Sequence, residues 1–495
     1  MLAVPVIEGQ SQPNSDRFRH ASRRARNLAK PERVSDTTRL KACVPNEVRE
    51  LCSRLAEGGF RSWIVGGCVR DELLSELDHK SSADIRGDWD IATSARPEQV
   101  QKLFRRVIPT GIQHGTVTVL MKKSSYEVTT LRGETTYTDG RRPDAVYFVD
   151  DIKDDLARRD FTINAIAYDP LADVLIDPFD GMRDLRARVL RAVGDPAVRF
   201  AEDGLRVLRA ARFVATLNVE LDPETERAII PSLDSYRKVS AERIRDEWLK
   251  ASQAKKPSRA FEVMKNHGLL AISAPELLES VGCEQNHYHA FDVWGHAMHC
   301  LDNCPAHPVL RMAGLLHDVG KPRSRAFSDK TNDYTFYEHE RIGAEMAGPM
   351  LERLRFSNEE RSRIVALVRH HLICYDATWT DSAVRRWVRR VSPELVEDLY
   401  ALTEADVTAK GKDASADLEN IAQLKAHVAK VIAQGAAFSI RDLAINGGTL
   451  MKELGVKPGP DIGRVLKALL EEVLEDPEKN QSAVLLDRAR ALLNA

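Results

Sequence analysis

The sequence has few cysteines, no long apolar run and almost no net charge. Its 495 residues include only 7 cysteines, an odd number that does not suit a disulfide framework and that favours a reducing cytoplasm with mostly free thiols. No apolar stretch approaches the roughly 20 residues that span a bilayer, and the first residues carry arginines instead of an apolar signal core. We therefore expect neither secretion nor membrane insertion.

The residues that are abundant are typical of a folded protein with several domains. Hydrophobic residues make up 43% and charged residues 29% of the chain, which excludes wholesale disorder and collagen-like or low-complexity architectures. The length of 495 residues exceeds that of a usual single domain, roughly 100–200 residues, so several compact units are expected.

The net charge of −2 conceals two basic segments. Residues 1–45 carry nine Lys and Arg against four Asp and Glu, and residues 182–260 carry seventeen against twelve. Such segments can bind a polyanion, but basic tails and solvated helical faces are also common in proteins that never touch nucleic acid. Charge alone leaves both interpretations open.

The pattern along the chain predicts an α+β protein with a mixed sheet near the N-terminus and helices afterwards. Residues 1–45 show no periodicity and are predicted to be a disordered basic arm. The β-rich runs are residues 62–65, 116–120, 126–130 and 145–148. From about residue 182 the pattern becomes amphipathic and helical, as in residues 204–214. The polar stretch between Arg132 and Tyr147 predicts a mobile loop.

Polar breaks near residues 255–257 and 411–413 suggest domain boundaries. The predicted parts are the arm at 1–45, a head at 46–180, a helical neck at 181–255, a helical domain at 256–410 and a helical tail at 411–495.

Two glycines and three acids in the head predict a site for phosphate and metal. Gly66 and Gly67 join a strand to a helix, where backbone N–H groups can approach phosphate oxygens. Asp88 and Asp90 are predicted on one face of a strand, where they can share a divalent cation such as Mg²⁺. Glu127 on a neighbouring strand would complete a two-metal site. A glycine pair or an Asp-x-Asp pattern alone is commonly structural, whereas the combination favours catalysis.

These residues resemble the class II tRNA nucleotidyltransferase and bacterial poly(A) polymerase family, within the polymerase-beta-like nucleotidyltransferase superfamily. The resemblance runs from residue 62 to about 250, and its motifs are residues 66–71, 88–90, 158–165, 177–181, 202–209 and 240–244. It implies a nucleotidyltransferase head, Mg²⁺ as cofactor, and a neck whose segment 202–209 selects the nucleotide.

The resemblance also implies individual roles. Asp88 and Asp90 would bind metal, and Glu127 would be a third catalytic carboxylate. The implied nucleotide-binding residues are Gly66, Gly67, Arg70, Arg159, Asp160, Asn164, Asp203, Arg206 and Arg209.

Two of these residues suggest how a nucleotide is chosen without a template. Asp203 and Arg206, three apart on one predicted helix, can pair with the exocyclic amine and the ring nitrogen that cytosine and adenine both present. An ordinary ion pair between Glu202 and Arg206 is the alternative. Asp160 could likewise cap a helix starting at Phe161 as well as bind nucleotide.

Nine of the fourteen histidines lie between His287 and His371. The set His296, His317, Asp318 and Asp406 resembles an HD-type metal-dependent phosphohydrolase domain. This resemblance implies a site for Ni²⁺, Mn²⁺ or Mg²⁺ that activates water against a phosphate ester. In this family such domains can also be an RNA-binding body without hydrolase activity, and the sequence leaves that choice open.

Further histidines could add ligands to the HD site, and other histidines and cysteines suggest an alternative metal site. The residues that could extend the HD site are His339, His370 and His371. A rival zinc site would combine His299 or Cys300 with Cys304 and His307, at spacings that fit no ordinary zinc finger.

The glycine-rich segment 443–464 is similar to the family's C-terminal helical tail. Its backbone amides could approach RNA phosphates, or the segment could be a plain helix-capping turn.

The predicted function is template-independent addition of CMP and AMP, from CTP and ATP, to the 3′ end of tRNA in the cytoplasm. The alternatives are a poly(A) polymerase, an enzyme that adds only part of CCA, and an RNA-binding HD protein with an inactive head. Residues 110–117 lack the basic character often seen there in the family's poly(A) polymerases, which favours the tRNA enzyme, and Asp88, Asp90 and Glu127 argue against an inactive head.

Overall fold

The computed structural model describes residues 37–78, 88–122, 124–134, 146–434 and 437–494. The chain divides into two compact units. The first comprises residues 1–132, 148–156 and 164–181, and the second comprises residues 133–147, 157–163 and 182–495. The five-part division of the sequence stays a prediction, because a division into two compact units does not test it.

The first unit is built from a sheet and the helices around it. Its strands are β1 (Ser62–Val65), β2 (Asp90–Thr93), β3 (Val107–Gly111), β4 (Thr116–Met121), β5 (Ser124–Thr130), β8 (Ala167–Asp169) and β9 (Val174–Ile176). Its helices are α1 (Thr38–Cys43), α2 (Asn46–Glu57), α3 (Gly67–Leu77), α4 (Pro97–Leu103) and α5 (Ile152–Ala157). Strands β6 (Arg132–Glu134) and β7 (Val146–Phe148) lie where the chain passes between the units.

The sheet is mixed, as the sequence predicts. Its strand order is β3-β4-β5-β2-β1-β8-β9, and β2 pairs with β5 in parallel whereas the other pairs are antiparallel. All four residues of β1 are buried, while burial alternates along β4, as expected for strands with two covered faces and one covered face respectively. Strands β1, β4, β5 and β7 lie at the four predicted β-rich runs.

The predicted disordered arm is wrong at its C-terminal end. Residues 38–43 form α1, and Leu40 is 1% exposed. Burial of an apolar side chain stabilises this short helix, which would be marginal by itself. Residues 1–36 and most of the predicted mobile loop, residues 135–145, lie outside the described residues.

The second unit is almost entirely helical. Its longer helices are α6 (Gly181–Ala187), α7 (Pro196–Glu202), α8 (Leu205–Thr216), α11 (Ala241–Ala251), α12 (Ser258–Asn266), α14 (Val293–Asn303), α15 (Pro308–Leu316), α17 (His339–Arg353), α18 (Asn358–His370), α19 (Asp381–Val391), α20 (Val396–Ala409), α21 (Ser415–Ala433), α22 (Gly447–Leu454), α23 (Pro460–Glu475) and α24 (Ser482–Asn494). Its short elements are α9 (Pro223–Arg227), α10 (Leu233–Tyr236), α13 (Leu269–Ser273), α16 (Lys321–Ser324), β10 (Val189–Leu190), β11 (Glu220–Leu221), β12 (Ala326–Ser328) and β13 (Asp333–Thr335).

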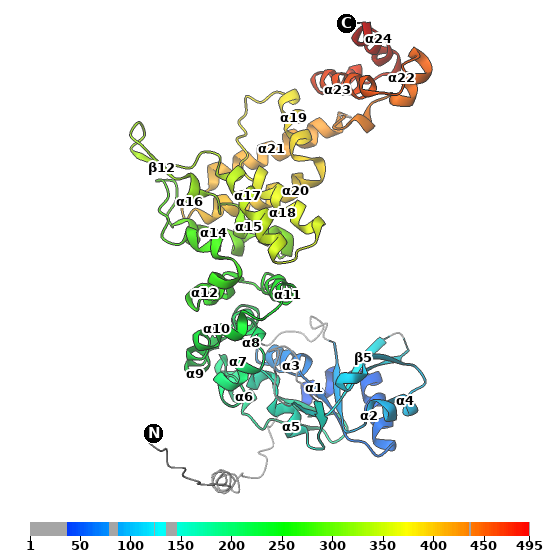
Figure 1. Cartoon of the computed structure of the whole chain (residues 1–495), viewed down its shortest axis with the longest axis vertical. Helices are drawn as coiled ribbons and strands as arrows, with labels where there is room; N and C mark the ends of the chain where they lie inside the picture. The colour runs from blue at the N-terminus through cyan, green and yellow to red at the C-terminus, as the bar shows by residue number, and fades with distance from the viewer. Residues whose placement is uncertain (1–36, 79–87, 123, 135–145, 435–436, 495) are drawn as a thin grey trace, which may run out of the picture. The chain divides into compact units, whose positions relative to one another are not determined.

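Three groups of helices pack within this unit (Figure 1). Helix α8 packs against α11 and α12, and its amphipathic pattern predicts the face that it buries. Helix α14 packs against α15 and α20, and α18 packs against α15 and α17. Helices α22, α23 and α24 enclose a separate apolar cluster that includes Leu450, Leu469 and Val473.

Two predictions about the whole chain can be compared with the described residues. All seven cysteines lie in these ranges and none of them forms a disulfide, as expected. Among the described helices, none combines the length and apolar character required to cross a membrane.

Candidate functional site

The glycine turn in the first unit has the predicted strand-to-helix geometry. Gly66 adopts φ 83° between β1 and α3, a conformation that L side chains rarely adopt, so the turn requires glycine. Gly67 is the first residue of α3. Arg70, 8% exposed, donates from Nη1 to Asn164 Oδ1 at 2.6 Å and from Nε to Asp71 Oδ1 at 2.7 Å. These contacts hold a guanidinium beside the start of the helix.

Two of the three predicted catalytic acids lie on neighbouring strands. Ile91 of β2 pairs with Val128 of β5 in parallel register. Continuing this register by one residue brings Asp90 level with Glu127, and residues level in adjacent strands share a face of the sheet. Asp90 is half-buried and Glu127 is exposed. Asp88 is exposed and precedes β2, so its predicted place within the strand is wrong.

Residues 202–209 of the second unit, predicted to select the nucleotide, differ from their predicted geometry. Asp203 is extended, with φ −142°, and helix α8 begins two residues later, so Asp203 and Arg206 do not lie on one helix. The Asp203 carboxylate accepts hydrogen bonds from Arg243 Nη1 at 3.2 Å and Nη2 at 2.7 Å. Arg206 instead donates to Glu202 Oε2 at 2.5 Å, so the alternative ion pair is present. The prediction of one helix through both residues is wrong because Asp203 is the residue that follows α7. Its carboxylate accepts a hydrogen bond from the Leu205 N–H at the start of α8.

Asp160 and Arg209 are joined directly in the same unit. Arg209 Nε donates to Asp160 Oδ2 at 2.8 Å, and Asp160 Oδ1 accepts from the Phe161 N–H at 2.9 Å. No helix starts at Phe161, because that residue forms an isolated β-bridge with Ala192 and a 3-10 turn begins at the next residue. Arg159 lies beside Asp160 in the short connection before that turn.

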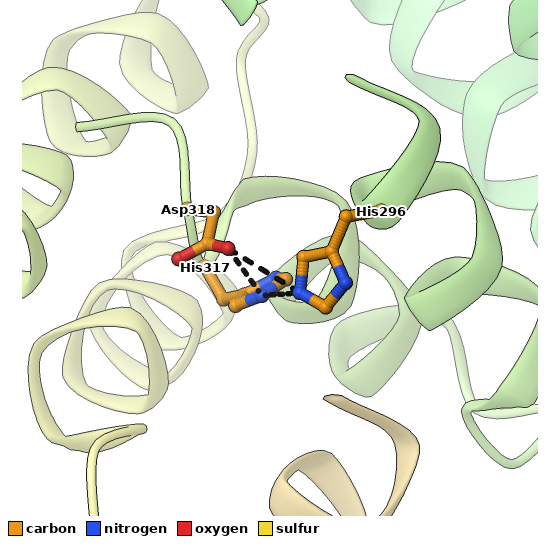
Figure 2. A group of neighbouring side chains, drawn as sticks. All are labelled: His296, His317 and Asp318. Carbon is orange, nitrogen blue, oxygen red and sulfur yellow. Dashed lines mark hydrogen bonds and ion pairs between the residues drawn. The ribbon is translucent and has the colours of Figure 1, made fainter. Parts of the chain in front are cut away.

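The predicted HD residues converge in the helical unit. His296 comes from α14, His317 and Asp318 follow α15, and Asp406 comes from α20. Figure 2 shows His296, His317 and Asp318 pointing toward one another. Asp318 Oδ2 lies 3.3 Å from His296 Nε2 and 3.1 Å from His317 Nε2, and Asp406 Oδ1 lies 2.9 Å from His296 Nε2. His296, His317 and Asp318 are at most 1% exposed.

Two of the three additional histidines join this cluster. His339 Nε2 lies 3.3 Å and His371 Nε2 lies 3.8 Å from Asp318 Oδ1. Among the described residues, the groups suited to a metal are His296 with His317 and Asp318, and Asp318 with His339 and His371. His370 is in neither group, so the prediction that it extends the site is wrong.

The buried carboxylates of the cluster favour a positive charge beside them. Burial disfavours a protonated ring, yet the Asp318 and Asp406 carboxylates raise the pKa of His317 to about 10. Burial, together with His317 and His339, lowers the pKa of His371 to about 3. A divalent cation is the partner that such buried acids and imidazoles commonly bind in proteins.

The cluster opens into a pocket of about 480 Å³. Its lining includes Asp318, Lys321, His339, His371 and Asp406, with aromatic side chains around them. Lys321 Nζ lies 2.7 Å from Asp318 Oδ2. Our sequence interpretation gave Lys321 no role, although its place three residues after Asp318 on a helical turn puts the two side chains together.

The rival zinc site is not formed. Cys300 and Cys304 are buried neighbours on one side of α14 and its end, whereas His299 and His307 are exposed.

The glycine-rich tail segment, residues 443–464, does contain the features of a helix-capping turn, which was the alternative to RNA contact. Asn446 and Thr449 form a capping box at α22, and Gly455 ends that helix with φ 69°. RNA contact by this segment stays a prediction.

Comparisons with known proteins agree along most of the chain. Residues 62–191 match the family described as Poly A polymerase head domain, residues 218–280 match the probable RNA and SrmB-binding site of polymerase A, and residues 339–489 match the putative tRNA nucleotidyltransferase domain 2.

Curated relatives and solved structures extend this similarity. A protein of Lactobacillus delbrueckii subsp. bulgaricus, a CCA-adding enzyme, is 34% identical over 455 residues, which cover 88% of this chain and 95% of that protein. A CCA-adding enzyme of Streptococcus suis is 31% identical over 470 residues, covering 91% and 98%. The crystal structure of the Bacillus stearothermophilus CCA-adding enzyme in complex with CTP has a TM-score of 0.66 and 26% identity, covering 90% of this chain and 98% of that one.

Proposed function

The chain belongs to the family of CCA-adding enzymes, and we propose that it adds CMP and AMP, from CTP and ATP, to the 3′ end of tRNA without a template. The observation that carries this proposal is the parallel register of β2 and β5, which brings Asp90 and Glu127 to one face of the head sheet. Two carboxylates on one face of a sheet can supply the acidic groups of a nucleotidyl-transfer site.

The chemistry is displacement at the α-phosphorus of the incoming nucleotide. The terminal tRNA hydroxyl oxygen forms a bond to that phosphorus, its proton leaves, and the bond to the β-phosphate oxygen breaks to release pyrophosphate. Asp88, which is exposed, and Asp90, which is half-buried, fit Mg²⁺ because carboxylate oxygens are hard donors. Bound Mg²⁺ would favour the ionised hydroxyl and neutralise the leaving pyrophosphate. Glu127 is proposed as the third catalytic carboxylate.

The first unit also offers groups for the triphosphate. Gly66 and Gly67 have no side chains of their own at the start of α3, so a phosphate could approach the backbone there, and α3 contributes its favourable dipole end. Arg70 adds a fixed positive charge, because Asn164 and Asp71 hold its guanidinium. We assign these residues to phosphate binding.

In the second unit we assign nucleotide selection to Asp203 and Arg206. Their roles need a carboxylate that accepts from an exocyclic amine and a guanidinium that donates to a ring nitrogen, both of which cytosine and adenine can satisfy. Uracil and guanine present the opposite arrangement of donor and acceptor, so they would leave polar groups of Asp203 and Arg206 unpaired. Arg243 holds Asp203. We assign Arg159, Asp160 and Arg209, the last of which binds Asp160, to sugar and phosphate contacts.

The experiment that tests this function offers the purified protein tRNA that lacks its 3′ CCA, together with single labelled nucleotides and defined mixtures. CTP alone should give addition of two residues, ATP alone none, and both together addition of three. Long adenosine tails would identify a poly(A) polymerase, and arrest after the cytidines with both nucleotides present would identify a partial enzyme. Absence of any transfer in Mg²⁺ would overturn the proposal.

A second activity is supported by the HD cluster. The convergence of His296, His317, Asp318 and Asp406 in a buried site beside an open pocket supports binding of a transition metal such as Ni²⁺ or Mn²⁺. We propose that this centre hydrolyses a phosphate ester and that Lys321, which pairs with Asp318 and lines the pocket, contributes positive charge beside the phosphate. Release of inorganic phosphate from a nucleoside monophosphate, lost on His317→Ala, is the test.

A further inference from the structure

The strand order of the head sheet defines two sides of the proposed transfer site. Strand β2, which carries Asp90, lies between β1 and β5. Asp90 pairs with Val65, the last residue of β1 before the glycine turn, so the turn assigned to the triphosphate lies on one side of Asp90. Glu127 of β5 lies on the other side, because β5 pairs with the opposite edge of β2.

The geometry of displacement decides which of these two sides receives the RNA. In phosphoryl transfer the attacking and leaving oxygens lie roughly in line, with phosphorus between them. Pyrophosphate that leaves toward the glycine turn therefore requires a hydroxyl that attacks from the side of β5. The terminal ribose of the RNA then lies over β5 and over β4, the next strand of the sheet.

A threonine lies directly beside Glu127 on this side. Thr118 of β4 is the antiparallel partner of Glu127, and paired residues share a face of the sheet with Cβ atoms roughly 5 Å apart. Burial alternates along β4, so Thr118 belongs to its open face, whereas Val117 and Val119 are buried on the other face. Asp90, Glu127 and Thr118 thus form one row across three neighbouring strands, with a hydroxyl next to the acids.

A second hydroxyl extends this row. Thr110, exposed near the end of β3, shares a hydrogen bond of 3.0 Å between its Oγ1 and Thr118 Oγ1. Two hydroxyls carry two protons and four lone pairs, and the bond between them uses one proton and one lone pair. One proton and three lone pairs therefore remain for other partners. The pair of Thr110 and Thr118 can both donate to a ligand and accept from it.

We infer that Thr118, supported by Thr110, recognises the 2′-hydroxyl of the ribose at the 3′ end of the RNA and so selects RNA over DNA as the acceptor. This inference deepens the proposed transfer function and rests on it. The 2′-hydroxyl is the polar group next to the attacking 3′-hydroxyl, and it is both a donor and an acceptor. With the 3′-hydroxyl at Asp90 and Glu127, a ribose directed along the row presents its 2′-hydroxyl to the next side chain, Thr118.

The test compares two acceptors that differ by one oxygen atom. tRNA that lacks only its terminal adenosine is prepared with a ribose or a 2′-deoxyribose at its last cytidine, and kcat/KM for AMP addition from ATP in Mg²⁺ is measured with the full-length protein. The unchanged protein should prefer the ribose end by about five- to tenfold, as one hydrogen bond provides. Thr118→Val should use both ends equally, at the rate of the unchanged protein on the deoxyribose end.

Two further variants separate recognition from structure. Thr118→Ser keeps the hydroxyl and should keep the preference for ribose. Thr129→Val is the matched control, because Thr129 lies on the same face and bonds to Thr116 at 3.0 Å but is level with Ala92 instead of Asp90. It should also keep the preference. Each comparison is made within one variant, so damage to the fold lowers both rates and leaves their ratio unchanged.

The outcomes distinguish this inference from the function on which it rests. Equal use of the two ends by the unchanged protein would overturn the inference and leave the transfer function standing. A preference that survives Thr118→Val, as expected if Thr118 contacts the terminal phosphate, or one that is lost equally in Thr129→Val, would do the same. Absence of AMP addition to either end by the unchanged protein would overturn the proposed function itself.

Discussion

Arg243 fixes the carboxylate of Asp203, although forty residues separate them in the chain. The guanidinium donates from both terminal nitrogens, at 3.2 and 2.7 Å, to the two oxygens of Asp203. Both side chains are largely buried, with exposed fractions of 24% for Arg243 and 16% for Asp203. A bidentate, partly buried ion pair of this kind fixes the orientation of the carboxylate, which the proposed role of Asp203 in base selection requires.

Replacing Arg243 by Ala should therefore weaken nucleotide selection while leaving Asp203, the proposed selecting residue, in place. We expect at least about a tenfold fall in CTP and ATP incorporation, equivalent to about 1.4 kcal/mol, and a rise in the share of UTP and GTP. Steady-state incorporation of each nucleotide measures this. Arg245→Ala on the same helix is the control, since Arg245 pairs with the adjacent Asp246. Equal effects of the two substitutions would refute the role of Arg243.

Asp203→Ala and Arg206→Ala should each relax discrimination against UTP and GTP and slow CTP and ATP incorporation. The reason is that each substitution removes one half of the pattern that cytosine and adenine satisfy. Glu202→Gln tests the alternative, because it weakens the ion pair of Arg206 while keeping the guanidinium. If Glu202→Gln changes the relative incorporation of the four nucleotides as much as Arg206→Ala does, the ion pair alone explains the effect.

Asp88→Ala or Asp90→Ala should reduce nucleotide transfer in Mg²⁺ by about 10³-fold or more, since several kcal/mol of charge stabilisation by metal would be lost. The fold should remain intact, because removing one of two neighbouring anions relieves repulsion in the metal-free protein. Transfer to tRNA and thermal unfolding are measured in parallel. Glu98→Ala is the control, being an exposed acid in the first turn of α4. Near-normal transfer by either aspartate variant would place the catalytic site elsewhere.

Metal binding in the helical domain should be separable from nucleotide addition. His317→Ala should lower the transition-metal content of the purified protein and leave CMP and AMP addition unchanged, because the predicted transfer residues lie outside this cluster. Metal analysis and the tRNA assay, run on the same preparations, measure both properties. Equal metal content in the wild type and in a variant carrying His317→Ala and Asp318→Ala would refute the HD assignment.

Gly320 should be essential for the shape of the metal cluster. A Cβ at this position would lie 2.2 Å from the His339 carbonyl oxygen and 2.5 Å from the Gly343 nitrogen, so Gly320→Ala must displace the start of α17. We expect a loss of about 1–3 kcal/mol in the free energy of unfolding, and weaker metal binding through His339.

Gly348→Ala, within α17, is the matched control for Gly320→Ala. Its nearest neighbour outside the helix backbone would be Val365 Cγ2 at 3.9 Å, so the new methyl group fits. It should be neutral or stabilise the helix by up to about 1 kcal/mol. Chemical denaturation of both metal-free variants, with metal titration of each, separates a local clash from a general effect of losing glycine.

The sequence by itself determined the features that depend on local chemistry. Alternating and β-branched runs place the strands of the head, because side chains in a strand alternate between two faces. Gly66 marks the turn before α3, since that turn needs a positive φ. His296, His317, Asp318 and Asp406 were predicted to form one cluster through their resemblance to an HD-type domain, and their imidazole and carboxylate groups are donors that a metal can bind.

Only the tertiary structure decided which distant side chains meet. Periodicity predicts the buried face of a helix but not the partner of that face, so the pairing of Asp203 with Arg243 could not be read from the chain. The same limit made the predicted helix through Asp203 wrong, because whether a residue continues a helix or caps the next one depends on the packing around it. His371 joins Asp318 while His370 does not, because the packing of α18 against α15 and α17 turns one ring toward the cluster and not the other.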